Sequence, residues 1–258
     1  LVPDETRKDV LSLVWPHLEP HLSGTNYSIG IAAGKHAYQP PPPGQWRHDA
    51  FRKDLVFVGK TQCGTEVCFP QKVVEADIRI LLGEIRPHYF AGYAGGAKTL
   101  FPGVAGATGI WTNHELKAHP SARLGSIDGN QCRLDMEEAA SMVGPSFILN
   151  IIRSPHGEVL DAVAGSTVPA HREGVRRARP IFEHQFDAPA RVVVISDRYP
   201  VTMNLYQACK LLPPAGMLLE EGGLIVLAAE CGDGIGPVTV INDGIYRLGS
   251  IHSLPKKH

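Results

Sequence analysis

The chain has 258 residues, a mass of 27.9 kDa and nearly balanced charge, with 25 Lys and Arg residues against 26 Asp and Glu residues. This balance provides no basic field to attract nucleic acid or anionic lipid. No apolar run approaches the roughly 20 residues that span a membrane. The five cysteines form no Cys-x-x-Cys pair, and no signal peptide is visible, so we expect a reduced, cytoplasmic protein.

The first third of the chain alternates short apolar segments with helical ones. A helical rhythm covers residues 10–22, and Pro40–Pro43 predict a surface loop over residues 39–47. Strands are expected at residues 27–33, 55–59, within 67–76, and at 78–83. This alternation predicts an α/β fold with a mostly parallel sheet and helices on its faces. In such sheets ligands bind beyond the carboxyl ends of the strands, where His36 and His88 follow two of the predicted strands.

The rest of the chain predicts a second unit. Helices are expected at residues 135–142 and 169–179, and the sequence Ala-Pro-Ala within residues 187–191 reads as a linker. A buried strand is expected at residues 192–196, the start of a helix at 204–210 and another strand at 222–229. We therefore predict two α/β domains, 1–187 and 191–258.

Residues 87–114 combine two imidazoles, a lysine and a glycine-rich turn. Gly95, Gly96, Lys98 and Thr99 resemble a phosphate cradle, because glycine lets backbone amides approach an anion. The Walker spacing is absent, so this turn is not a P-loop. A structural glycine turn with a surface lysine and a ligand-binding loop are equally compatible with this segment.

Each of the other polar candidates also has a structural interpretation. His36, His88 and His114 taken singly are compatible with structural hydrogen bonding, and Gln207 and Lys210 with one solvated helix face. Asp4 and Arg7 are compatible with an exposed ion pair at the start of a helix. Three histidines at the ends of predicted elements, with Lys98 between two of them, favour a functional site.

Taken together, these segments resemble the nickel-pincer-nucleotide lactate racemase family over most of the chain. The matching residues are 87–98, 101–104, 113–114, 119–125, 128–130, 135–136, 204–210, 221–223 and 231–234. Several separate segments in the right order make this resemblance more specific than any one motif.

The resemblance implies a pyridinium mononucleotide whose two thiocarbonyl sulfurs and ring carbon hold nickel. Lys98 would carry this cofactor as a thioamide, and His114 would be the protein's nickel ligand. His36 and His88 would be the acid/base pair. The substrate carboxylate would be oriented by five residues, which are Asp4, Arg7, Tyr206, Gln207 and Lys210.

The implied reaction is racemisation or epimerisation of a lactate-like 2-hydroxy acid in a cleft between the two domains. A hydride leaves for the cofactor and returns to either face of a 2-keto acid, while one base serves each enantiomer. Histidine, with an unperturbed pKa near 6.5, suits that task. Nickel accepts imidazole and sulfur ligands, arginine binds carboxylates bidentately, and the cofactor supplies the hydride chemistry. The expected partners are the substrate and the enzymes that build the cofactor.

The sequence departs from the family in ways that keep two alternatives open. Ala37 stands where an arginine commonly follows the histidine, Lys8 replaces a usual proline, and parts of both ends are expected to be missing. One alternative is a truncated or degenerate relative that binds an anion without turnover. The other is a phosphate- or nucleotide-binding transferase, in which the three histidines would have no evident role.

Overall fold

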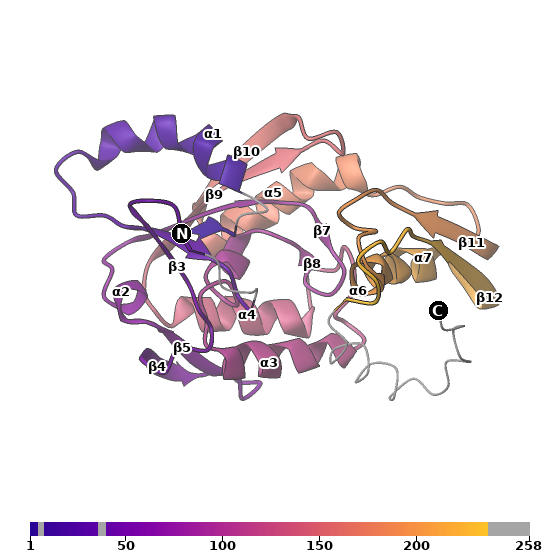
Figure 1. Cartoon of the computed structure of the whole chain (residues 1–258), viewed down its shortest axis with the longest axis horizontal. Helices are drawn as coiled ribbons and strands as arrows, with labels where there is room; N and C mark the ends of the chain where they lie inside the picture. Colours follow the sequence, from indigo (N-terminus) through magenta and orange to yellow (C-terminus); the bar gives the residue numbers. More distant parts are fainter. Residues whose placement is uncertain (5–7, 36–39, 237–258) are drawn as a thin grey trace. The chain divides into compact units, whose positions relative to one another are not determined.

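A computed structural model describes residues 1–4, 8–35 and 40–236 of the chain (Figure 1). It divides into two compact units, Leu1–His184 and Gln185–His258. His36, Arg7 and the end of the chain after residue 236 lie outside the described residues.

Parallel strands form the centre of the first unit. β1 (Val2–Pro3), β2 (Ile29–Ala32) and β3 (Gln45–Arg47) pair in parallel in this order. β6 (Arg79–Glu84) pairs in parallel with β9 (Ser146–Arg153), and β10 (Val159–Ser166) adds to β9 in the antiparallel sense. Leu1 accepts from the Leu82 amide at 2.8 Å and donates to the Ile80 carbonyl at 2.6 Å, which joins β1 to β6.

Helices cover both faces of these strands. α1 (Lys8–Leu18) packs Val10 and Val14 on Val2, Ile31, Leu82 and Ile151 in one apolar cluster. A larger cluster contains Leu81 and Ile148, together with residues of α3 (Ala107–Glu115), α4 (Gln131–Ser141) and α5 (Thr167–Phe182). β6 and β9 therefore have apolar neighbours on both faces, as expected for parallel strands inside an α/β fold.

The remaining elements of the first unit are short. The hairpins are β4 (Leu55–Lys60) with β5 (Glu66–Pro70), and β7 (Pro87–His88) with β8 (Gly92–Tyr93). The short helices are η2 (Glu19–Leu22), α2 (Gln71–Val74), η3 (Gly96–Thr99) and η4 (Leu116–Ala118).

The second unit contains a parallel pair of strands, β11 (Ala190–Ser196) and β12 (Leu219–Ala228). Between them lie α6 (Leu205–Ala208), η5 (Cys209–Leu211) and α7 (Leu212–Leu218). The Asn204 side chain caps α6 by accepting from the Gln207 amide at 2.9 Å. This capping bond explains why the helix begins where the sequence predicts it.

The predicted fold class is confirmed as mixed α/β with mostly parallel strand pairing. The prediction of a loop over residues 39–47 is wrong at its end, because Gln45–Arg47 forms β3 and Arg47 is buried. The prolines that suggested a loop end at Pro43, before the strand begins. Within the described residues, no helix is long and apolar enough to cross a membrane. The predicted domain boundaries and the cleft between the domains stay predictions.

Candidate functional site

His88 and Lys98 are brought together by a tight hairpin followed by a helical turn. His88 ends β7 opposite Gly92 of β8, and Lys98 lies in η3. The Lys98 Nζ atom is 3.2 Å from Nε2 of His88. On the other side of the ring, the Ala91 amide donates to Nδ1 of His88 at 3.3 Å. The Ala91 amide thus makes Nδ1 an acceptor, and Lys98 contacts the ring at its other nitrogen.

The buried Phe90 ring joins these residues to His114. Its centroid is 4.6 Å from that of His88 and 5.2 Å from that of His114. The Nζ atoms of Lys98 and Lys117 lie 5.3 Å and 4.9 Å from the same ring centre, which is within range for a cation–π contact. A single aromatic side chain thus keeps two imidazoles and two amines around one point.

His114 lies near the end of α3 in an environment that keeps its ring neutral. Burial lowers its pKa to about 2, and the positive charges of Lys117, Lys98 and Lys35 act in the same direction, while the Ile110 carbonyl opposes the shift. Nδ1 of His114 is buried and has no hydrogen-bond partner. A neutral imidazole with a nitrogen that no protein group occupies is suited to bind a metal ion.

The position of His114 is fixed by its neighbour Asn113. The Asn113 amide donates to the Cys132 carbonyl at 3.1 Å and to a carboxylate oxygen of Asp135 at 2.7 Å. Asp135 is almost fully buried and also accepts hydrogen bonds from the hydroxyls of Thr61 and Thr65. Helices α3 and α4 are therefore joined by a satisfied polar network directly beside His114.

In the glycine turn, the Gly96 amide has a partner within the chain. It donates to Oδ1 of Asn150 at 2.7 Å, so this donor is already used. Both Gly95 and Gly96 have positive φ, and a Cβ atom at Gly96 would lie 2.8 Å from the His171 ring. The Thr99 hydroxyl donates to the Leu82 carbonyl at 3.0 Å. These glycines and Thr99 thus have clear structural roles, which position Lys98.

A buried arginine from α4 supports the His88–Lys98 loop. Arg133 has no exposed surface and donates to the carbonyls of Ala91, Tyr93 and Gly95. Asn130 holds the Phe90 carbonyl at 2.9 Å. The sequence analysis did not predict either supporting role, since nothing in the local pattern tells which distant carbonyls a polar side chain will reach.

The substrate-binding candidates lie in both units. Asp4 is buried directly after β1, and Arg7 and His36 are outside the described residues. In the second unit, Lys210 Nζ lies 5.6 Å from the Tyr206 ring centre. Gln207 belongs to α6 and Lys210 to η5, so the one continuous helix face that the sequence suggests is interrupted by a change of helix type.

Two domain models from one family match the chain. The lactate racemase N-terminal domain matches residues 44–125, and the lactate racemase C-terminal domain matches residues 186–245. Together these matches span more than half of the chain. They cover His88, Lys98 and His114 in the first unit and Tyr206, Gln207 and Lys210 in the second.

Whole proteins and solved structures give the same result. The chain is 33% identical over 204 residues to a lactate racemase of Thermoanaerobacterium thermosaccharolyticum, covering 78% of this chain and 46% of that protein. It is 30% identical over 184 residues to a lactate racemase of Lactiplantibacillus plantarum, covering 70% and 43%. The chain thus spans about half the length of these curated relatives.

The structure of the lactate racemase apoprotein from T. thermosaccharolyticum superimposes with a TM-score of 0.83 at 30% identity, covering 91% of this chain and 61% of that one. The crystal structure of a Thermotoga maritima protein gives a TM-score of 0.68 at 20% identity, covering 88% and 64%, and supports the fold alone.

Proposed function

The chain belongs to the lactate racemase family, and we propose from this premise that it is an isomerase that inverts the hydroxyl-bearing carbon of a 2-hydroxy acid such as lactate. The single observation that carries the proposal is the grouping of His88, Lys98 and neutral His114 around Phe90. An acid/base imidazole, an amine and a metal-binding imidazole at one point have no shared structural purpose.

The residues present fit the nickel-pincer nucleotide that the family resemblance implies. Lys98 would hold it covalently, and His114 would bind its nickel through a neutral ring nitrogen. The described residues contain no group of three or more His, Cys, Asp or Glu side chains that could hold a metal ion, so the other donor atoms would come from the cofactor. When bound, this group supplies an acceptor for the hydride of the substrate.

The protein's own contribution is to move a proton and to orient the substrate. His88 would take the proton from the hydroxyl of one enantiomer, and His36 would serve the other. The Lys98 Nζ atom lies 3.2 Å from Nε2 of His88, so the proposed tether and the proposed base are direct neighbours.

The substrate carboxylate would meet a cationic region. The charges of Lys35, Lys98 and Lys117 all act on His114. Arg7, with Asp4 beside it in the sequence, and Lys210, with Tyr206 and Gln207, would complete its orientation. Lactate, other 2-hydroxy acids and sugar acids share the carboxylate and hydroxyl that these residues would recognise.

The first test is mass spectrometry of the chain produced together with the cofactor-building enzymes. We expect a covalent adduct on the peptide that contains Lys98, and bound nickel. Lys98→Arg should lose the adduct, whereas the matched variant Lys117→Arg should keep it, since Lys117 also contacts Phe90 but is not the proposed tether. An unmodified Lys98 without bound nickel would contradict the cofactor assignment.

The second test is chiral chromatography of a panel of 2-hydroxy acids incubated with the loaded chain. We expect racemisation of at least one member, and its loss in His88→Gln. A loaded chain that inverts no member of the panel would overturn the isomerase proposal while leaving the cofactor assignment intact. That outcome would favour the non-catalytic alternative.

A further inference from the structure

Among the described residues of the first unit three arginines are buried, and two of them have evident partners. Arg79 donates to the carbonyls of Val73, Val74 and Pro145. Arg133 donates to three carbonyls of the His88–Lys98 loop and lies 3.9 Å from a carboxylate oxygen of Glu137. Both side chains are therefore satisfied by the protein itself.

Arg47 is the exception among these three. Its exposed fraction is 7%, and its Nε and Nη1 atoms are buried without a hydrogen-bond partner. Buried guanidinium nitrogens without partners are costly, because these N–H groups have lost their hydration and gained no hydrogen bond in exchange. The cost is explained if an anion from outside the chain supplies the missing acceptors.

The strand pairing places Arg47 at a functional edge of the sheet. It is the last residue of β3 and pairs with Ile31, next to the end of β2. β1, β2 and β3 run in parallel, so their carboxyl ends share one edge, where Asp4 follows β1. Ligands of α/β proteins bind at this edge.

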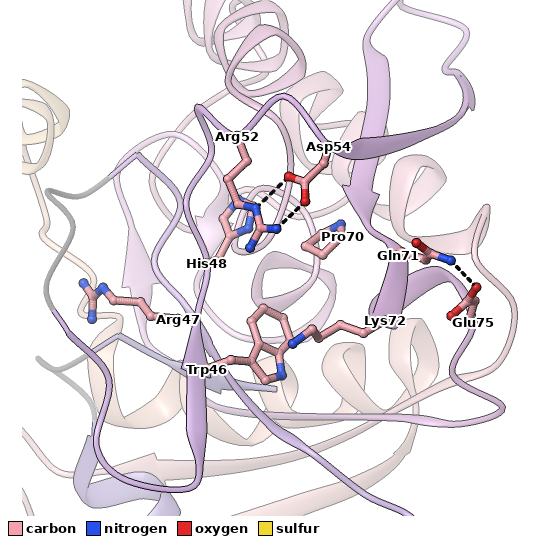
Figure 2. Close-up of a pocket in the computed structure, with 9 residues that line it drawn as sticks. All are labelled: Trp46, Arg47, His48, Arg52, Asp54, Pro70, Gln71, Lys72 and Glu75. Carbon is pink, nitrogen blue, oxygen red and sulfur yellow. Dashed lines mark hydrogen bonds and ion pairs between the residues drawn. The ribbon is translucent and has the colours of Figure 1, made fainter.

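The face that Arg47 occupies can also be assigned. A Cβ atom on Gly30 would meet the Trp46 ring at 2.2 Å, so Trp46 covers one face of the sheet. Arg47 is the next residue and projects to the opposite face, the one on which Ile31 packs with Val10 and Val14 of α1. Figure 2 shows its guanidinium pointing away from Trp46 and from the Arg52–Asp54 pair.

We propose that Arg47 is a binding residue for an oxyanion, either a carboxylate or a phosphate, at the carboxyl edge of the β1–β2–β3 sheet. Its planar guanidinium matches both groups through paired N–H donors. Which oxyanion it takes rests on the proposed function, since the substrate offers a carboxylate and the implied nucleotide a phosphate. The inference that Arg47 binds an oxyanion at all depends only on its burial and on the missing partners of Nε and Nη1.

The test uses the complete, cofactor-free chain, so it does not depend on racemase activity. Thermal unfolding and calorimetric titration are followed with inorganic phosphate, with lactate, and with chloride at matched ionic strength. We expect a saturable rise in melting temperature with phosphate or lactate but not with chloride. Stabilisation by phosphate alone would identify the nucleotide as the source of the anion, and stabilisation by lactate would identify the substrate.

Variants separate binding from structure. Arg47→Met should weaken the anion effect by about tenfold or more, because charge-assisted hydrogen bonds are lost, and Arg47→Lys should weaken it less. Without anion, Arg47→Met should melt at or above the wild-type temperature, since it removes an uncompensated buried charge. The matched control Arg52→Met, on an exposed arginine that also lines the cavity of about 370 Å³ in Figure 2, should keep the anion effect.

Three outcomes would overturn the proposal. The first is the absence of any saturable effect of phosphate or lactate on the wild type. The second is an Arg47→Met variant that is destabilised without anion and still responds fully to it, as expected for a structural arginine. The third is an equal loss in Arg52→Met, which would place the anion in the cavity of Figure 2, lined by both arginines, and not at the carboxyl edge of the sheet.

Discussion

Buried charged side chains have different surroundings in two regions of the first unit. One region is the set of α4 side chains that support the His88–Lys98 loop, and the other is the carboxyl edge of the sheet at Arg47. Beneath the loop, Arg133 and Asp135 each meet several protein partners. At the sheet edge, Arg47 is almost as well buried and meets none through Nε or Nη1. The comparison teaches that burial alone does not distinguish a scaffold residue from a binding residue. The number of partners within the chain does.

The largest effect is expected for Arg133→Met. The substitution removes three hydrogen bonds from a buried guanidinium to the carbonyls of Ala91, Tyr93 and Gly95, so we expect a loss of about 3–5 kcal/mol in the free energy of unfolding. Urea denaturation measures it, with the highly exposed Arg191→Met as control. At Arg47 the same substitution should not lower the free energy of unfolding. A loss of under about 1 kcal/mol in Arg133→Met would therefore mean that the two buried arginines do not differ in their contribution to stability.

A somewhat smaller effect is expected for Asp135→Ala. It removes the acceptor for Thr61, Thr65 and Asn113, and we expect a loss on the order of 3 kcal/mol. Asp128→Ala is the matched control, because that side chain is 92% exposed. Equal urea midpoints for the two variants would show that the network beside His114 contributes no stability.

Gly96→Ala tests how closely the loop is packed against its support. The added Cβ must adopt φ +63° and lie 2.8 Å from the His171 ring, so we expect a loss of about 2 kcal/mol or more. Gly129→Ala has a similar φ of +70° with no atom within 4 Å, and should cost only about 1 kcal/mol. The difference between the two in chemical denaturation isolates the contact. Equal losses of stability in Gly96→Ala and Gly129→Ala would mean that a Cβ atom at residue 96 fits beside His171 without a clash.

The smallest effect is a dependence of stability on pH at His171. Its pKa is lowered well below 6.5, mainly by burial and then by Arg133, while the Ala94 carbonyl opposes the shift. The unfolded chain therefore binds a proton that the folded chain does not, and stability should fall as the pH drops below about 6.5.

The limiting slope at His171 is about 1.4 kcal/mol per pH unit. We expect His171→Gln to be less stable at pH 7.5 but to lose less stability between pH 7 and pH 5. Urea midpoints across this range, with the exposed His156→Gln as control, provide the measurement. Parallel profiles for wild type and His171→Gln would mean that this ring charges freely in the folded chain.

The sequence predicts the positions of the strands better than it predicts the polar side chains that hold the loops in place. Apolar runs located β2, β4, β6, β11 and β12. For β6 the reason is burial on both faces of a parallel strand. The prediction that residues 192–196 form a buried strand is wrong in its burial, because Val192 and Val194 of β11 are exposed. Arg47 was assigned to a loop, since three residues of strand directly after a proline run have no period of their own. Arg133 was missed for another reason. Its partners are the carbonyls of Ala91, Tyr93 and Gly95, which lie about 40 residues away, and only the folded chain brings them within reach of Arg133.

The site was predictable where chemistry dictates residue type. A lysine between two histidines suggested a site, and the structure places His88, Lys98 and His114 around Phe90. The roles of these three residues stay predictions. The glycines could be predicted only in part. The sequence indicates that residues 95–96 form a turn, but it does not show that the Gly96 amide donates a hydrogen bond to Asn150.

Three side chains that support the loop, those of Arg133, Asn150 and His171, follow it in the chain, and this order bears on synthesis. The bonds from Arg133, Asn150 and His171 back to the loop span 42, 54 and 77 residues. As the chain emerges from the ribosome, the loop is made first and obtains its shape only after His171 is available. Contacts of this range also slow folding, because a long segment must be ordered before they form. A chain that stops between Lys98 and His171 would contain the two reactive side chains without the structure that aligns them.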